Sequence, residues 1–236
     1  MKLNPSFVKT RNVRNYEVLM DTLALSEGEG RFGVVFSPAG FGKSRTSQWY
    51  AAQHQAIYMR VLTIWTSSEM EFLRALAREL GVLTPPRTKA AAFTAVLDRL
   101  VVRPRIIILD EPEKLPPRFL DLARDLTDLS ISPIVFVGEV DLISYLQAER
   151  RVWSRVFQVV EFEPIGASDI VFYAAEVAGL RLDKGAAELA AKDTGGDFRE
   201  VRRLATTLVP MAKGKGGQNV DREMVRIALK QLLRGN

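Results

Sequence analysis

The sequence contains no cysteine and a single histidine, His54, among its 236 residues. The absence of cysteine excludes a disulfide framework and thiolate metal sites. His54 lies in a predicted helix-to-strand connection without the partner residues that metal or catalytic sites need, so we interpret it as structural. No run approaches the roughly 18 apolar residues of a membrane span, and the N-terminus shows no apolar export segment. We therefore expect a cytoplasmic protein.

The composition fits a globular α/β domain with a small appendage, since 47% of the residues are hydrophobic and 26% are charged. Lysine and arginine number 33 against 28 aspartates and glutamates, which gives a formal net charge of +5. This modest basic excess is compatible with a polyanionic partner, and equally with a solvated basic surface. Charge alone leaves both interpretations open.

The stretch from Gly33 to Thr46 predicts a phosphate-binding loop. An apolar run that ends at Phe36 reads as a buried strand, a glycine-bearing loop follows over 37–42, and Lys43 opens a helix. This strand–loop–helix setting is what a P-loop requires. The glycines of the loop let the backbone turn several N–H groups inward, and the start of the helix adds positive potential.

Three residues of this loop carry the chemistry that we expect. Lys43 would reach the β- and γ-phosphates of a nucleotide, and the Ser44 hydroxyl would be a ligand of Mg²⁺. Ser37 stands where a P-loop usually has its first glycine. The alternative interpretation is an ordinary strand-to-helix turn that binds nothing.

A second pattern, Arg105–Asp110 followed by Glu111, makes that alternative less favourable. Four consecutive aliphatic residues predict a strand buried on both faces, and an acidic pair at its end is the Walker B pattern. Ligands of open α/β sheets bind beside such strand ends. Asp110 would hold the Mg²⁺ shell and Glu111 would polarise the attacking water. A buried strand that merely ends in acids is the competing interpretation.

Strands and helices alternate up to a boundary at Pro164–Ala167, which predicts a parallel sheet with right-handed crossovers. We therefore predict an α/β P-loop NTPase with a three-layer core and a five-stranded parallel sheet over residues 1–164. Residues 165–236 are predicted to form an all-helical lid. The expected N-caps are Thr10, Ser67 or Ser68, Ser168, Asp183 and Asp221.

The predicted core and lid, with Gly196–Arg199 (Gly-Asp-Phe-Arg) at the start of a lid helix, resemble an AAA+ ATPase. Within that superfamily the chain resembles the Mu B, TnsC and IstB group of transposition regulators. The features that carry this resemblance are Thr10–Val13, Ser37–Ser44, Tyr58–Trp65 and the run Ile134–Gly138 before Glu139. The Mu B protein has an additional N-terminal DNA-binding domain without counterpart here, so DNA contacts made through that domain are not implied.

The resemblance implies a role for each matching residue. Asn12 and Val13 would border the adenine, and Arg45 would lie beside the phosphates. The residues that would wrap the phosphates are Ser37, Pro38, Ala39, Gly40, Phe41, Gly42, Lys43 and Ser44. Asp110 and Glu111 keep the roles given above.

Three further positions correspond to sensors and to a finger. Glu139 falls at sensor 1, where a neutral side chain is more usual and where a carboxylate would repel the γ-phosphate unless it is paired or held away. Arg199 fits sensor 2. Arg155, or alternatively Arg150 or Arg151, could act as a finger in a neighbouring subunit's site, which requires an oligomer.

By this resemblance, the chain would be an ATP- and Mg²⁺-dependent ATPase that assembles as a ring or helical filament on double-stranded DNA. It would activate or direct a transposase, in a bacterial cell or phage-infected host, and hydrolysis would disassemble the filament. Its DNA contacts would be to phosphates and weakly sequence-dependent. Candidate residues are Lys2, Lys9, Arg87, Lys89, Arg103, Lys213 and Lys215. The alternatives are a replication initiator or helicase loader, and a nucleotide-dependent switch without a DNA role.

Overall fold

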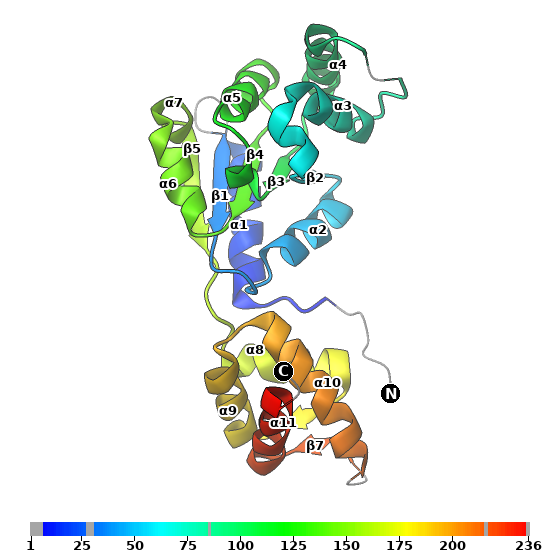
Figure 1. The fold of residues 1–236 in the computed structure, drawn as a ribbon, viewed down its shortest axis with the longest axis vertical. Helices are drawn as coiled ribbons and strands as arrows, with labels where there is room; N and C mark the ends of the chain where they lie inside the picture. Colours follow the sequence, from blue (N-terminus) through cyan, green and yellow to red (C-terminus); the bar gives the residue numbers. More distant parts are fainter. Residues whose placement is uncertain (1–6, 27–30, 85, 215–216, 235–236) are drawn as a thin grey trace. The chain divides into compact units, whose positions relative to one another are not determined.

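The computed structural model describes residues 7–26, 31–84, 86–214 and 217–234 (Figure 1). The chain divides into two compact units. The core unit comprises Asn15–Pro38 and Lys43–Phe162, and the lid unit comprises Met1–Arg14, Ala39–Gly42 and Glu163–Asn236. The domain boundary expected between residues 164 and 165 remains a prediction. No described helix combines the length and the apolar character needed to cross a membrane.

The core unit is built on a five-stranded sheet in the order β2-β3-β4-β1-β5, and every pair of neighbouring strands is parallel. The prediction of a five-stranded parallel sheet is therefore confirmed. A register shift between Phe32 and Gly33 interrupts the pairing of β1 with β5. The strands are β1 (Phe32–Phe36), β2 (Ile57–Arg60), β3 (Ile107–Asp110), β4 (Ile134–Gly138) and β5 (Val156–Glu161).

Helices cover both faces of the sheet, as the buried central strands require (Figure 1). On one face, Leu19 and Leu23 of α1 lie directly over Gly33 of β1. Tyr16 of the same helix donates a hydrogen bond to Ser47 of α2. The other face packs in one apolar cluster against α3–α7. The helices are α1 (Arg11–Leu25), α2 (Lys43–His54), α3 (Glu69–Glu79), α4 (Lys89–Val102), α5 (Arg118–Ser130), α6 (Asp141–Ala148) and α7 (Arg150–Trp153), with 3₁₀ turns η1 (Thr63–Ser67) and η2 (Pro112–Lys114).

Two expectations for helix ends in the first half of the chain have different outcomes. Ser68 caps α3 by accepting a hydrogen bond from the Glu71 N–H, as predicted. Thr10 precedes α1, but its hydroxyl is buried without a hydrogen-bond partner, so the predicted side-chain cap is wrong. The helical segment that follows β4 is interrupted at Glu149, between α6 and α7.

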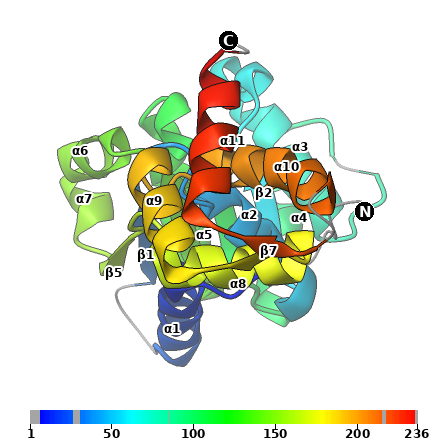
Figure 2. The same ribbon diagram turned by 90° about the horizontal axis from the view of Figure 1, so that it is seen from below.

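The lid unit contains four helices among its described residues (Figure 2), and these helices share an apolar cluster of their own. They are α8 (Ala167–Ala178), α9 (Lys184–Thr194), α10 (Phe198–Gly214) and α11 (Arg222–Arg234). The all-helical expectation is corrected by a short parallel pair, β6 (Arg181–Leu182) with β7 (Asn219–Val220). Asp183 and Asp221 cap α9 and α11 as predicted, whereas Ser168 lies inside α8 and Gly166 is the N-cap.

Candidate functional site

The loop between β1 and α2 has the backbone that the sequence predicted. Gly40 and Gly42 have φ angles of 95° and 94°, a region that side-chain-bearing residues rarely occupy. Ser37, at the usual first glycine, does not have a positive φ and is fully buried. A serine is therefore compatible with this loop, because the position makes no demand for glycine's backbone freedom.

Lys43, the first residue of α2, is buried, and its ammonium group lies within the loop. Its Nζ donates to Ser37 O at 2.8 Å, to Ser37 Oγ at 2.9 Å and to Pro38 O at 2.9 Å. A buried cation requires such partners. Phosphate oxygens would be stronger, charged acceptors for the same ammonium.

The acidic pair lies at the C-terminal end of β3, beside the start of this loop. The Ser37 N–H donates to Gly138 O at the end of the neighbouring strand β4, and α2 packs against β3 and β4. The Asp110 side chain is buried, and Tyr58 Oη donates to its Oδ2 at 2.6 Å. The loop and the acids are thus brought together at one edge of the sheet, as predicted for ligands of parallel sheets.

Glu111 has a left-handed backbone, with φ of 65° and ψ of 42°, and two cations contact its carboxylate. Arg60 of β2 donates to Oε1 at 3.1 Å and to Oε2 at 3.3 Å, and Lys114 Nζ donates to Oε2 at 2.6 Å. Burial alone would raise the pKa of Glu111, but the hydrogen bonds and charges of Lys114 and Arg60 outweigh it and lower that pKa. The Glu111 carboxylate is therefore ionised, and both of its oxygens accept hydrogen bonds from these two cations.

Glu113 is a third acid at this edge, and the sequence motifs did not predict its involvement. Its Oε1 accepts a hydrogen bond from the Glu139 N–H at 3.0 Å, while its Oε2 is buried without a partner. A Cβ at Gly138 would collide with this carboxylate. Burial raises the pKa of Glu113. The available signals were its place two residues after Glu111 and the glycine that ends β4.

Glu139 immediately follows β4, where sensor 1 was expected, and its side chain is exposed. Its backbone N–H, rather than its carboxylate, is the group engaged with Glu113. The Glu139 carboxylate thus faces solvent, and its assignment to sensor 1 remains a prediction.

The residues expected around the base and the phosphates lie in different settings. Asn12 is buried and exchanges two hydrogen bonds with the backbone of Glu163, at 2.7 Å and 3.1 Å. Val13 is buried in α1, and Arg45 is exposed on α2. Within the lid unit, Arg199 is exposed in the first turn of α10, where its N–H donates to Asp197 Oδ1 at 2.6 Å.

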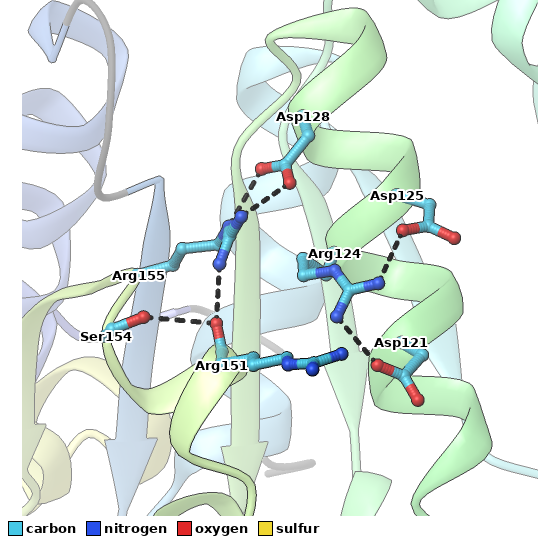
Figure 3. Close-up of polar contacts among 7 residues, drawn as sticks. All are labelled: Asp121, Arg124, Asp125, Asp128, Arg151, Ser154 and Arg155. Atoms are coloured by element: carbon cyan, nitrogen blue, oxygen red, sulfur yellow. Dashed lines mark hydrogen bonds and ion pairs between the residues drawn. The ribbon is translucent and has the colours of Figure 1, made fainter.

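Arg155 lies just before β5 and so at the N-terminal edge of the sheet, opposite the edge that carries Asp110. Figure 3 shows its guanidinium forked onto Asp128 of α5, with distances of 2.9 Å and 2.7 Å. Its Nη1 also donates to Arg151 O at 2.6 Å. On the same helix, Arg124 bridges Asp121 and Asp125. The structure therefore does not bring Arg155 to the acids of its own chain.

Two of the residues present fit a magnesium ion bound together with a nucleotide. Ser44 offers an exposed hydroxyl in the first turn of α2, and Asp110 offers a carboxylate at the end of β3. Among the described residues, no cluster of three or more His, Cys, Asp or Glu could hold a metal. A hydroxyl with one carboxylate is the donor set of Mg²⁺ sites that are completed by phosphates and water.

The chain matches a family model described as the AAA domain over residues 26–146, just over half of its length. It is 25% identical over 204 residues to the "Mu-like prophage FluMu DNA transposition protein B" of Haemophilus influenzae, covering 83% of this chain and 70% of the relative. It is also 25% identical over 236 residues to the "ATP-dependent target DNA activator B" of Escherichia phage Mu, covering 97% and 74%.

Solved structures agree on the fold. The Aeropyrum pernix ORC2 protein superposes with a TM-score of 0.67 at 15% identity, over 97% of this chain and 70% of that one. A variant of Thermotoga maritima RuvB gives a TM-score of 0.63 at 16% identity, over 96% and 70%. At these identities the likeness concerns architecture alone. The match to the family model over residues 26–146 shows that the chain belongs to the AAA domain family, and the two relatives make it an AAA+ P-loop ATPase of the Mu B-like kind.

Proposed function

We propose that this protein is an ATP-dependent, largely sequence-nonspecific DNA-binding ATPase that assembles on target DNA and activates or directs a transposase. One observation carries the proposal: a P-loop and an acid pair meet at one sheet edge in a chain that aligns over 97% of its length with a phage target DNA activator. The protein would act in the cytoplasm of the bacterial or phage-infected cell.

Nucleotide binding would use the groups of the loop that are already in place. The backbone N–H groups around Gly40 and Gly42 would surround the phosphates, and Lys43 would exchange its three loop oxygens for β- and γ-phosphate oxygens. Ser44 and Asp110 would hold Mg²⁺, which when bound with ATP neutralises charge on the phosphates.

Hydrolysis requires a carboxylate that can accept a proton from water or orient it, and we assign this role to Glu111. In the structure Arg60 and Lys114 occupy this carboxylate. Turnover would therefore require Glu111 to leave these two cations. This requirement predicts a slow basal rate.

The remaining assignments follow the resemblance. Arg199 would meet the γ-phosphate from the lid, Asn12 and Val13 would border the adenine, and Glu139 would stand at the sensor 1 position. Arg155 would act as a finger in a second subunit's site, because it lies at the opposite sheet edge from the acids of its own chain.

The lid unit offers the surface that we assign to DNA. Residues 199–236 carry nine lysines and arginines against three acids, whereas residues 165–198 carry three against six. The exposed basic residues of α10 and α11 include Arg199, Arg202, Arg222, Arg226 and Lys230. Such a surface binds phosphates with little sequence preference and with strong salt dependence.

Two of the DNA-contact candidates named from the sequence already have partners within the chain. Lys89 pairs with Glu69, and Arg103 donates to Gln55 at 2.6 Å. Lys213 is exposed near the end of α10 and belongs to the basic half of the lid. Lys2 and Lys215 lie outside the described residues.

Electron microscopy of the protein with plasmid DNA tests the proposal, with ATP, ADP and no nucleotide compared. We expect filaments or rings on DNA with ATP, and none for Lys43→Ala. DNA affinity should fall with salt, and Arg222→Ala with Lys230→Ala should flatten that dependence, whereas Lys184→Ala on the acidic half should not. ATP binding without any DNA binding would favour the nucleotide switch. Capture of a replicative helicase instead of a transposase would favour the loader.

A further inference from the structure

Tyr58 contacts the acid of the candidate magnesium site from the neighbouring strand. Its Oη donates to Asp110 Oδ2 at 2.6 Å, the length of a strong hydrogen bond to a carboxylate. Asp110 is 1% exposed, so water cannot readily replace this donor. The contact therefore fixes the rotamer of a buried carboxylate.

The register of the sheet explains why these two side chains meet. Tyr58 lies opposite Ile108 in the β2–β3 pair, and Asp110 is two residues further along β3. Side chains at such diagonal positions share one face of a sheet and are within reach of a long aromatic residue. Their neighbours Met59 and Leu109 belong to the apolar cluster on the opposite face. Tyr58 and Asp110 therefore face the α2 side.

The phenol also interacts with the helix that begins at the phosphate-binding loop. A side-chain hydrogen bond with Gln48 of α2 lowers the pKa of the Tyr58 hydroxyl. Burial has the larger, opposite effect, so the pKa of this phenol is raised overall and it remains a neutral O–H donor. Tyr58 thus lies between the helix that carries Ser44 and the strand that carries Asp110, the two donors assigned to the metal.

We propose that Tyr58 is a positioning residue that holds Asp110 in the orientation required by the Mg²⁺ shell. The hydrogen bond occupies Oδ2, and Oδ1 would remain to interact with a bound magnesium ion or its water ligands. Partners of this kind typically contribute tenfold or more to metal affinity through the ligand that they orient. The proposal rests on the nucleotide site proposed above and adds a residue to it.

The test is Tyr58→Phe, which keeps the ring and removes the donor. The measurement is the affinity for ADP by calorimetry, with magnesium and with EDTA. We expect the affinity in EDTA to stay within about twofold of the wild type, and the gain brought by magnesium to fall about tenfold. An unchanged or larger magnesium gain would overturn the proposal. An equal loss of affinity in both conditions would also overturn it, because it would indicate a general structural role.

Tyr145→Phe is the matched control. Tyr145 is another half-buried tyrosine, and it donates to a backbone carbonyl, Leu115 O, at 2.7 Å. Its substitution removes a comparable hydrogen bond without touching Asp110, so the magnesium gain should remain at the wild-type value. A wild-type protein that binds no ADP would refute the nucleotide site itself. Wild-type binding with a magnesium gain that Tyr58→Phe leaves intact would refute the role of Tyr58 alone.

Discussion

Removal of the cations that occupy Glu111 should raise ATP turnover in the absence of DNA. Arg60 and Lys114 take up the lone pairs of this carboxylate and lower its pKa, although burial acts in the opposite direction. A carboxylate in this state is a poor partner for water and a weak base. Arg60→Ala would increase both the fraction of molecules with an available Glu111 and the basicity of that group.

The size of the effect follows from exposure. The side chains of Arg60 and Lys114 are 62% and 56% exposed, so solvent screens both pairs. Each pair then contributes about 0.5–1 kcal/mol. Arg60→Ala should therefore raise basal turnover about two- to fivefold, and the double substitution with Lys114→Ala about five- to thirtyfold.

A coupled ATPase assay at saturating ATP, without DNA, measures this effect, with ADP affinity determined in parallel. Lys184→Ala is a suitable control, because it removes a 3.9 Å pair with Glu188 on the surface of the lid unit. Basal turnover that is unchanged or reduced in Arg60→Ala, at unchanged ADP affinity, would refute the reasoning. Arg60 would then assist the reaction instead of restraining it.

Three other substitutions test neighbouring parts of the site. Glu111→Gln should lower turnover at least about a hundredfold while ATP stays bound and assemblies persist in electron micrographs; normal turnover would place water activation elsewhere. Arg155→Ala should abolish turnover but keep ADP affinity, and mixing with Lys43→Ala subunits should restore part of the activity; a mixture that stays inactive argues against a shared site. Because the pKa of Glu113 is raised, the free energy of unfolding of the wild type should fall as the pH rises from 4.5 through that pKa. Glu113→Gln should remove this fall, which urea unfolding at a series of pH values would measure.

The parts of the fold and site that were predictable depend on residues close together in sequence. The strand before the loop and the buried strand that ends in Asp110 each carry their own pattern of apolar residues, and the glycine-bearing loop marks the start of the helix at Lys43. Because parallel strands end at a common edge, two local patterns were enough to place the loop beside the acids. The turn chemistry of Gly40 and Gly42 was equally local.

The unpredicted features depend on contacts between residues distant in sequence or on weak local signals. Arg60 meets Glu111, and Tyr58 meets Asp110, through the register of β2 against β3, about fifty residues apart in each case. The β6–β7 pair has two residues in each strand, too few for a period-two pattern to be visible. For α8 the sequence offered Ser168, a good N-cap type, but the helix begins one residue before it.

Arg155 and the acid pair lie at opposite edges of the parallel sheet. A group at the N-terminal edge cannot reach a site at the C-terminal edge of the same strands, so Arg155 cannot contact a nucleotide bound beside Asp110 and Glu111 of its own chain. Within its own chain, the Arg155 guanidinium makes a bidentate pair with the Asp128 carboxylate, which is the strongest geometry for such a pair. A second subunit's triphosphate would have to compete with that carboxylate, and its higher charge favours the exchange. On the proposed function, assembly thus supplies Arg155 with a better partner, and a subunit alone keeps both Arg155 and Glu111 paired within its own chain.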